Sequence, residues 1–313
     1  MGTDKTVQIL LSTYNGEKYL REQLESFVTQ TIFPDISVLI RDDGSTDGTG
    51  AILRQYAEAY GFRVEYGTNI GVTRSYLWLI EHADDACSYF AFSDQDDVWL
   101  PKKLEKTIAE FETMDKQKPR MVATLSEIVD ENLAHLGFSQ RAGKGASFFN
   151  AMVQNICPGH TQIIDRKLRE TLLKTTDSCA ILVMDWWIYL VASGVGTVKI
   201  LPEATVLHRQ HGNNTVGYRT TFWELLPMRL RRLHGKEAAA MTRQLDAALR
   251  CYGTEFAEEC CQELKCFLAG LSSTKRRIEY VRRARIYRQT EIETAIVKVL
   301  YVLGKYHVKN GQK

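Results

Sequence analysis

Apolar residues in the first half of this chain fall into short continuous runs that alternate with helix-like patterns. Runs at 7–11, 36–40 and 89–92 have the length and apolar content of buried strands. After the first two runs, apolar residues recur three or four positions apart, as on one face of a helix. Strand–loop–helix units in series form parallel strands with right-handed crossovers. We therefore expect an α/β, Rossmann-like fold in which a mostly parallel sheet is flanked by helices.

A polar cluster follows each of the three predicted strands. Residues 12–16 (Ser-Thr-Tyr-Asn-Gly) follow the first strand and residues 41–49 (Arg-Asp-Asp-Gly-Ser-Thr-Asp-Gly-Thr) follow the second. Residues 93–99 (Ser-Asp-Gln-Asp-Asp-Val-Trp) follow the third. Ligands of open parallel sheets bind beyond the carboxyl ends of the strands. The three clusters therefore predict one binding site at this edge of the sheet.

Three aspartates, Asp94, Asp96 and Asp97, stand close together in the third cluster. Their mutual repulsion is costly unless a cation lies between them. Asp94 and Asp96 are two positions apart, so in an extended segment they project to the same side and can share one hard divalent ion. Protein-bound Mg²⁺ of this kind is typically held by one or two carboxylates and by substrate phosphates. The alternative is a solvated turn whose acids cap the next helix.

The order and spacing of the three clusters resemble the motifs of family 2 glycosyltransferases, which have the GT-A fold, over about residues 5–215. The form of residues 93–99 is most similar to bacterial rhamnosyltransferases that build cell-wall or O-antigen polysaccharide. This resemblance implies a nucleotide-sugar donor, either dTDP-L-rhamnose or a UDP-hexose, and a lipid-linked glycan acceptor. It also implies Mn²⁺ or Mg²⁺, which stabilises the charge that develops on the departing diphosphate.

The donor-binding residues follow from the first clusters and from this resemblance. Tyr14 offers a flat face on which a pyrimidine can stack, and Asp43 offers an acceptor for the N–H of uracil or thymine. The alternative for either acid of the Asp42–Asp43 pair is that it only caps the turn that follows. Arg74 is placed to reach a phosphate or to be an ordinary surface arginine. The residues expected to bind the nucleotide-sugar are Thr13, Tyr14, Asn15, Asp43, Asn69, Gly71, Arg74, Asp94 and Arg209.

Two histidines, His208 and His211, lie close together after a further predicted strand. Neutral imidazole is a suitable additional ligand for a divalent ion. The family carries the pattern Arg-Gln-His-x-x-Asn at this place, here at 209–214. The resemblance therefore implies that His211 joins Asp94 and Asp96 at the metal, whereas we expect His208 to be a packing residue.

An acidic residue, Asp185, stands between an apolar run and the tryptophans Trp186 and Trp187. A buried acid is costly unless it is hydrogen-bonded or functional, and burial raises a carboxyl pKa toward the range useful for a general base. The resemblance assigns the catalytic base of an inverting transfer to this position. The alternative is that Asp185 caps the following helix, and the two roles are compatible. The segment 155–166 departs from the family pattern, so the acceptor is not predicted.

The last third of the chain differs in charge from the rest. Net charge is +2 overall, but residues 1–218 carry −7 and residues 219–313 carry +9. We predict a catalytic domain at 1–218, with its nucleotide-sugar half at about 1–100 and its acceptor half at about 101–218, and a basic helical region at 219–313. Amphipathic basic segments, such as 222–233, favour either an anionic membrane surface or packing against another domain or a second subunit as a homodimer. No recognisable nucleic-acid-binding module accompanies them.

Cysteine content and the start of the chain bear on the compartment. The seven cysteines are odd in number and include no Cys-x-x-Cys pair, as expected of reduced thiols in a cytosolic protein. The segment before the first predicted strand, residues 1–6, is short and polar and does not resemble a signal peptide. We therefore expect a cytoplasmic protein that is peripheral on the inner face of the plasma membrane.

Two other functions remain as alternatives. A nucleotidylyltransferase would need a glycine-rich phosphate loop after the first strand, and residues 12–16 lack one. A catalytically silent scaffold or binding subunit could keep the same fold, but retention of Asp43, Asp94, Asp96 and Asp185 together argues against it.

Overall fold

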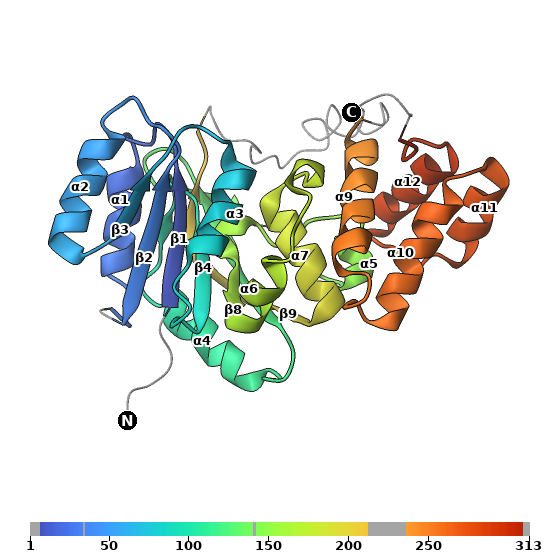
Figure 1. The fold of residues 1–313 in the computed structure, drawn as a ribbon, viewed down its shortest axis with the longest axis horizontal. Helices are drawn as coiled ribbons and strands as arrows, with labels where there is room; N and C mark the ends of the chain where they lie inside the picture. Colours follow the sequence, from blue (N-terminus) through green and yellow to red (C-terminus); the bar gives the residue numbers. More distant parts are fainter. Residues whose placement is uncertain (1–6, 34, 140–141, 212–235, 309–313) are drawn as a thin grey trace. The chain divides into compact units, whose positions relative to one another are not determined.

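The computed structural model describes residues 7–33, 35–139, 142–211 and 236–308, and the chain divides into two compact units (Figure 1). The first unit consists of Met1–Arg141, Cys157–Leu173 and Gly196–Gly217. The second consists of Ala142–Ile156, Lys174–Val195 and Tyr218–Lys313. One division falls beside the boundary expected at residue 218. Two earlier segments, however, cluster with the C-terminal helices rather than with the sheet.

Within its described residues, the first unit is built on a nine-stranded sheet of order β3–β2–β1–β4–β8–β6–β9–β5, with β7 paired to β6 outside this path. The strands are β1 (Val7–Thr13), β2 (Ile36–Asp42), β3 (Arg63–Tyr66), β4 (Tyr89–Ser93), β5 (Val98–Trp99), β6 (Arg120–Val129), β7 (His135–Phe138), β8 (Ile163–Asp165) and β9 (Thr197–Arg209).

The sheet is mixed rather than mostly parallel. The expected parallel pairing holds for β2, β1 and β4, and β3, which was not predicted, joins them parallel to β2; these four strands lie side by side in Figure 1. Beyond β4, β8 runs antiparallel to both β4 and β6, and β5 runs antiparallel to β9. Antiparallel strands need no crossover helix, so they can join a sheet through short connections that leave no strand–helix alternation in the sequence.

Helices cover the parallel part of the sheet and supply its core. In the first unit these are α1 (Leu20–Val28), α2 (Thr49–Tyr60), α3 (Val72–His82), α4 (Lys103–Thr113), α6 (Arg166–Leu172) and the short 3₁₀ helix η1 (Gly159–Thr161). Alternate residues of β1, such as Ile9, share one core with Leu24 of α1 and Leu53 of α2. Each such fully buried leucine contributes about 1.5–3 kcal/mol relative to an exposed one. This core fixes the strand ends from which the polar loops emerge.

A buried ion pair joins β6, β8 and α6. Asp165 caps α6 by accepting the Leu168 N–H at 2.9 Å, and it pairs with Arg120 Nε at 2.8 Å. The backbone N–H of Arg120 also donates to Asp165 at 3.0 Å. Removing one partner of a buried pair typically costs about 3–5 kcal/mol, so this contact holds β8 between its neighbours.

The second unit is helical in its described residues, as expected for the C-terminal region. It contains α5 (Phe148–Ala151), the 3₁₀ helix η2 (Ser178–Ala180), α7 (Met184–Val195), α9 (Lys236–Tyr252), α10 (Glu258–Gly270), α11 (Thr274–Arg283) and α12 (Glu291–Val302). An aromatic cluster centred on Phe267 and Tyr301 packs between α10, α11 and α12. The predicted basic segment at 222–233 lies outside the described residues. Among the helices described, none combines the length and apolarity that a bilayer span requires.

Candidate active site

A glutamine that the sequence analysis did not single out joins two of the predicted loops. Gln95 Oε1 accepts hydrogen bonds from Thr13 Oγ1 (2.7 Å) and Tyr14 N–H (2.9 Å), and its Nε2 donates to the Tyr14 carbonyl (3.2 Å). A Cβ at Gly16 would lie 2.6 Å from Gln95 Oε1, so glycine leaves room for this contact. The loop after β1 is thereby positioned by the loop after β4.

A cavity of about 430 Å³ opens at these loops, on the first unit. This volume is within the range of small-ligand sites. The Tyr14 side chain at its edge is 46% exposed, so its ring is accessible to a ligand. The cavity is lined by Tyr14, Asn15, Gly16, Lys18, Tyr19, Gln95, Asp96, Glu131 and His211.

Asp43 and Asp42 have different environments although they are neighbours. Asp43 is buried, pairs with Arg41, and accepts the backbone N–H groups of Ile70 and Gly71, each at 2.9 Å. It therefore fixes the turn that contains Asn69 and Gly71, two of the residues predicted to bind the nucleotide-sugar. Asp42 accepts the Ser45 N–H at 3.3 Å, which is the turn-capping role considered as the alternative for this pair.

Asn15 fixes the loop after β2 against the loop after β1. Its backbone has a positive φ of 48°, a conformation that Asn tolerates better than most residues. The side-chain oxygen accepts the Thr46 N–H at 2.9 Å, and the Asn15 N–H donates to Ser45 Oγ at 2.8 Å. Asn15 thus lines the cavity, and its predicted contact with the nucleotide-sugar stays a prediction.

The structure brings two of the three predicted metal-binding residues into direct contact. His211 Nε2 lies 2.8 Å from Asp96 Oδ2, and the His211 ring stacks on Tyr19. Asp94 lies in the same loop and accepts from the Tyr76 hydroxyl at 3.3 Å. Burial, with the charges of Asp97 and Asp94, raises the pKa of Asp96. The negative charge of Asp96 is costly in these surroundings, and a cation would offset it. The Asp96 carboxylate and the His211 imidazole together form a donor set that fits Mn²⁺ or Mg²⁺.

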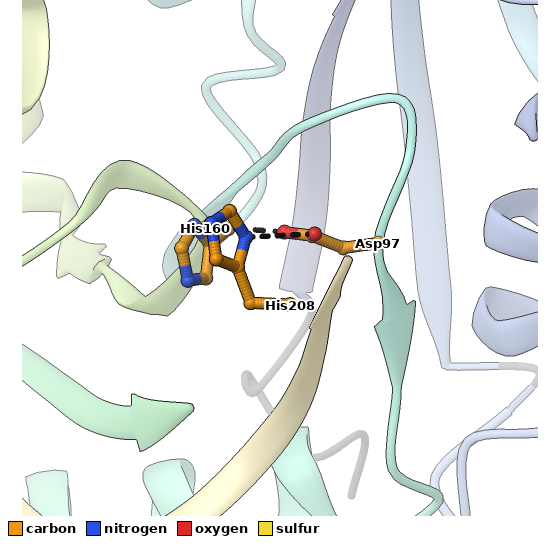
Figure 2. A group of neighbouring side chains, drawn as sticks. All are labelled: Asp97, His160 and His208. Carbon is orange, nitrogen blue, oxygen red and sulfur yellow. Dashed lines mark hydrogen bonds and ion pairs between the residues drawn. The ribbon is translucent and has the colours of Figure 1, made fainter. Parts of the chain in front are cut away.

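A second cluster, Asp97 with His160 and His208, was not predicted from the sequence (Figure 2). His208 was expected to be a packing residue; its ring does stack on His160, with centroids 4.4 Å apart, and its Nδ1 also lies 2.9 Å from Asp97 Oδ1. Burial alone would raise the pKa of Asp97, but the charge of His160 and the hydrogen bond from His208 lower it. The three residues are far apart in the chain, and only the motif position of Asp97 hinted at a role.

The two arginines of the predicted donor site are placed differently. Arg209 is buried; its Nε donates to the Asp96 carbonyl at 3.0 Å, and its Nη1 donates to the Glu131 carbonyl at 2.6 Å. These contacts hold the end of β9 against the loop that carries Asp96. Arg74 lies exposed in the first turn of α3. A phosphate contact by either arginine stays a prediction.

Asp185 belongs to the second unit and lies in the first turn of α7. Its Oδ1 accepts the N–H of Trp186 at 2.6 Å, and the Trp186 indole donates to the Ala151 carbonyl at 2.6 Å. A carboxylate is stabilised at a helix N-terminus by the helix dipole. Because α7 begins at Met184, Asp185 lies within the first turn of the helix and not at the cap position before it; its role as a base stays a prediction.

Two relatives of known sequence cover most of this chain. It is 28% identical to dTDP-rhamnosyl transferase RfbG of Shigella flexneri over 225 residues. This alignment covers 68% of this chain and 75% of RfbG. It is 27% identical over 252 residues to the uncharacterized protein Mb1547 of Mycobacterium bovis, which spans 77% of this chain and 68% of that one.

Solved structures of glycosyltransferases share the fold. Residues 1–349 of S. aureus TarS, in complex with UDP-GlcNAc, align with a TM-score of 0.55 at 16% identity, over 98% of this chain and 92% of TarS 1–349. The mannosyltransferase PcManGT of Pyrobaculum calidifontis, in complex with GDP-Man and Mn²⁺, aligns with a TM-score of 0.53 at 15% identity, over 96% and 85%. At these identities the likeness concerns the fold alone.

The sequence itself gives the family. The family description "Glycosyl transferase family 2" matches residues 8–173, which is more than half of the chain and includes the three polar clusters at 12–16, 41–49 and 93–99. One of these relatives, RfbG, is a dTDP-rhamnosyl transferase by name. The protein is therefore a glycosyltransferase of family 2, with a GT-A-like fold and C-terminal helices.

Proposed function

We propose that this enzyme transfers L-rhamnose from dTDP-L-rhamnose, with inversion, to a lipid-linked polysaccharide acceptor. The observation that carries the chemistry is the Asp96–His211 pair on a cavity whose edge exposes the Tyr14 ring. The rhamnosyl donor rests on the form of residues 93–99 and on the similarity to RfbG. A UDP-hexose is the alternative donor for the same chemistry.

Donor binding is assigned to the loops after β1 and β2. The base stacks on Tyr14, and its N–H donates to Asp43. Asp43 already accepts two backbone N–H groups and pairs with Arg41, but a carboxylate has about four acceptor positions, which leaves one for the base. Thr13, Asn15, Asn69, Gly71 and Arg74 surround the rest of the nucleotide-sugar.

Asp96, Asp94 and His211 are the residues that would hold Mn²⁺ or Mg²⁺. When bound there, the ion supplies positive charge for the diphosphate as it leaves. Arg209 has a supporting role in this proposal, because its guanidinium holds the backbone of Asp96.

The acceptor is activated by Asp185. Its carboxylate takes the proton of the acceptor hydroxyl as that oxygen attacks the sugar C1 on the face opposite the leaving diphosphate. A single displacement of this kind inverts the configuration at C1. General-base catalysis typically contributes about 10²–10⁴-fold to the rate.

We also propose that the basic C-terminal region rests on an anionic membrane surface from the cytoplasmic side. Residues 219–313 carry +9, and the exposed residues of α11 include Lys275, Arg276 and Arg282. Such a surface attracts basic segments by about 1 kcal/mol per residue near the lipid. A lipid-linked acceptor would be reached from this position. Contact with a second subunit is the alternative for the same surface.

The test combines donor binding with turnover. Ligand binding to the native state raises the melting temperature, so dTDP-rhamnose with Mn²⁺ is expected to stabilise the wild type. Asp96→Asn is expected to lose the metal-dependent part, whereas the exposed Asp115→Asn keeps it. Asp185→Asn is expected to keep donor stabilisation and to lose transfer by about 10²-fold or more.

Three outcomes would contradict parts of the proposal. Stabilisation only by UDP-sugars would discard the rhamnosyl donor and keep the mechanism. Unchanged glycan transfer by Asp185→Asn would remove the assigned base. No stabilisation by any donor, with acceptor present, would favour the catalytically silent scaffold.

A further inference from the structure

The ring of Tyr19 contacts two residues of the candidate active site, although the sequence analysis did not single it out. The His211 ring stacks on it, with centroids 5.2 Å apart and planes at 27°. The central carbon of the Arg209 guanidinium lies 4.5 Å from the Tyr19 centroid. Both distances are usual for an aromatic pair and for a cation over an aromatic ring. Tyr19 thus touches the imidazole that contacts Asp96 and the arginine that holds the Asp96 backbone.

The backbone of Tyr19 is held by the start of α1. Its N–H donates to the Gly16 carbonyl at 3.1 Å, and its carbonyl accepts the Glu22 N–H, also at 3.1 Å. The next residue, Leu20, is wholly buried in the core of the first unit. A turn on one side and a packed helix on the other therefore fix the point from which the Tyr19 ring projects.

A carboxylate holds the other end of the Tyr19 side chain. The Tyr19 hydroxyl donates to Glu131 Oε2 at 3.1 Å, and Lys18 Nζ donates to the same oxygen at 2.7 Å. The hydrogen bond from Lys18 lowers the pKa of Glu131, so this carboxylate stays ionised and remains an acceptor. The Glu131 carbonyl accepts from Arg209 Nη1 at 2.6 Å. The contacts of Tyr19 with Glu131, of Glu131 with Arg209 and of Arg209 with Tyr19 therefore close a circuit.

His211 depends on side-chain contacts for its orientation. β9 ends at Arg209, two positions earlier, so the pairing of β9 in the sheet stops before this residue. The His211 side chain is nevertheless only 12% exposed, and its Nε2 lies 2.8 Å from Asp96 Oδ2. The torsion that turns an imidazole about its Cβ–Cγ bond has broad minima, so neighbouring groups must set the direction of the ring nitrogens. The Tyr19 ring, stacked on the imidazole, is such a neighbour.

We propose that Tyr19 is a positioning residue of the metal site, which orients His211 toward the ion and is itself held by Glu131. This inference rests on the proposed function, in which Asp96, Asp94 and His211 hold Mn²⁺ or Mg²⁺. Groups that orient a metal-binding histidine typically contribute about 10–100-fold to metal affinity. Tyr19 also lines the cavity, so the experiment has to separate its action through His211 from a direct contact with the donor.

Binding of Mn²⁺ to the full-length protein tests the proposal without sugar transfer. Equilibrium dialysis at one fixed concentration of dTDP or UDP, whichever stabilises the wild type, gives the apparent Kd of Mn²⁺. Tyr19→Leu removes the ring and is expected to raise this Kd about 10–100-fold. Tyr19→Phe keeps the ring and loses the hydroxyl, so an increase of about fivefold or less is expected, as for one hydrogen bond.

A double-mutant cycle separates action through His211 from direct contact with the donor. In the His211→Ala background the imidazole is gone, so the further change Tyr19→Leu is expected to alter the Mn²⁺ Kd by less than about twofold. The aspartates and the diphosphate are expected to keep this Kd measurable. The matched control is Tyr60→Leu, because Tyr60 also stacks on an aromatic ring but does not line the cavity. It is expected to keep the wild-type Kd even where it lowers the melting temperature.

The proposal is overturned if Tyr19→Leu keeps the wild-type Mn²⁺ Kd, or if it raises the Kd equally with and without His211. In both cases a higher Kd of His211→Ala alone leaves the metal site of the proposed function standing. A wild type that binds no Mn²⁺ with either nucleotide overturns this inference together with that metal site. Should Tyr19→Leu fail to fold, Tyr19→Phe decides by the same comparison in the two backgrounds.

Discussion

Gln95 shows how a single side chain connects the two parts of the donor site. Its amide holds both the N–H and the carbonyl of Tyr14, while its own backbone sits between Asp94 and Asp96. Base stacking and metal binding are therefore properties of two loops that share one hydrogen-bonded contact. Loss of that contact is expected to affect donor affinity more than the chemical step.

Gln95→Ala is expected to raise the KM for the donor about tenfold with a smaller change in kcat, because each lost hydrogen bond is worth roughly 1 kcal/mol and Tyr14 loses its fixed position. Gly16→Ala is expected to act in the same direction, since its Cβ would displace the Gln95 amide. Steady-state kinetics at varied donor concentration measure both effects. The exposed Gln262→Ala is the control, and an unchanged donor KM in Gln95→Ala would contradict the role.

At this scale, local motifs decided what the sequence could predict. The contact of Asp96 with His211 followed from two short motifs, each complete within a few residues. Asp97, His160 and His208 are 63 and 48 positions apart in turn, so no local pattern connects them. Only the pairing of β9 with β5 and β6 brings His208 to Asp97, and that pairing was not part of the prediction.

Among the elements, α4 begins with an unusual residue. Lys103 is wholly buried, its Nζ donates to the His160 carbonyl at 3.1 Å, and it lies over the Trp99 ring at 4.7 Å. Burial lowers the pKa of Lys103 to about 7, although the charge of Asp97 opposes this shift. The start of α4 thus carries a lysine whose charge is costly in the folded state.

The stability of the first unit is therefore expected to rise with pH above about 7. Between that value and the ordinary lysine pKa of 10.5, the unfolded chain binds a proton that the folded protein does not. Below pH 7 the destabilisation is complete. Lys103→Met is expected to remove this dependence and to be more stable than the wild type at pH 6, by a difference on the order of a few kcal/mol that shrinks toward pH 10.

Urea unfolding at pH 6, 7.5 and 9 on the wild type and on Lys103→Met measures this difference. The neighbouring exposed Lys102→Met is the matched control and is expected to keep the wild-type pH dependence. Parallel pH profiles for the wild type and Lys103→Met would show that Lys103 does not titrate in this range.

Strands and helices with a clear pattern of apolar residues were predicted, and elements too short to show such a pattern were not. The strands β1, β2 and β4 and the helices after the first two appeared in the sequence because a continuous core enforces their pattern. β5 has two residues and β8 has three, which is too few for any periodic signal. Most antiparallel pairings of the sheet involve β5 or β8, whereas the long strands β6 and β9 pair parallel, so the sequence indicated a more parallel sheet than the one observed.

Over the whole molecule, charge separates along the chain, and this separation predicts where a membrane would bind. The protein is expected to bind vesicles that contain anionic lipid and to dissociate as salt screens the attraction. Reversing two exposed charges of α11, with Lys275→Glu and Arg276→Glu, is expected to weaken binding about 30-fold or more, from roughly 1 kcal/mol per basic residue. Vesicle sedimentation at two salt concentrations measures the vesicle affinity of the wild type and of this variant.

The matched control carries the same charge change on the first unit, with Lys116→Glu and Lys118→Glu, both exposed. If vesicle binding weakens equally in both variants, the effect depends only on the net charge of the protein, and a specific basic face on α11 is contradicted. Vesicle binding that does not change, together with a dimer that α11 reversal dissociates in light scattering, would assign this surface to a second subunit.

The place of β9 in the sheet has a consequence for synthesis on the ribosome. β9 (197–209) lies between β6 and β5 and is the only partner of β5 among the described strands, yet it is the last of the described strands to be made. A nascent chain can pair β1, β2 and β4 early, because these strands are close in sequence. The loop with Asp96, however, gains its partners His208, Arg209 and His211 only when β9 emerges. Catalytic competence is thus withheld until the segment that ends at His211 has left the ribosome.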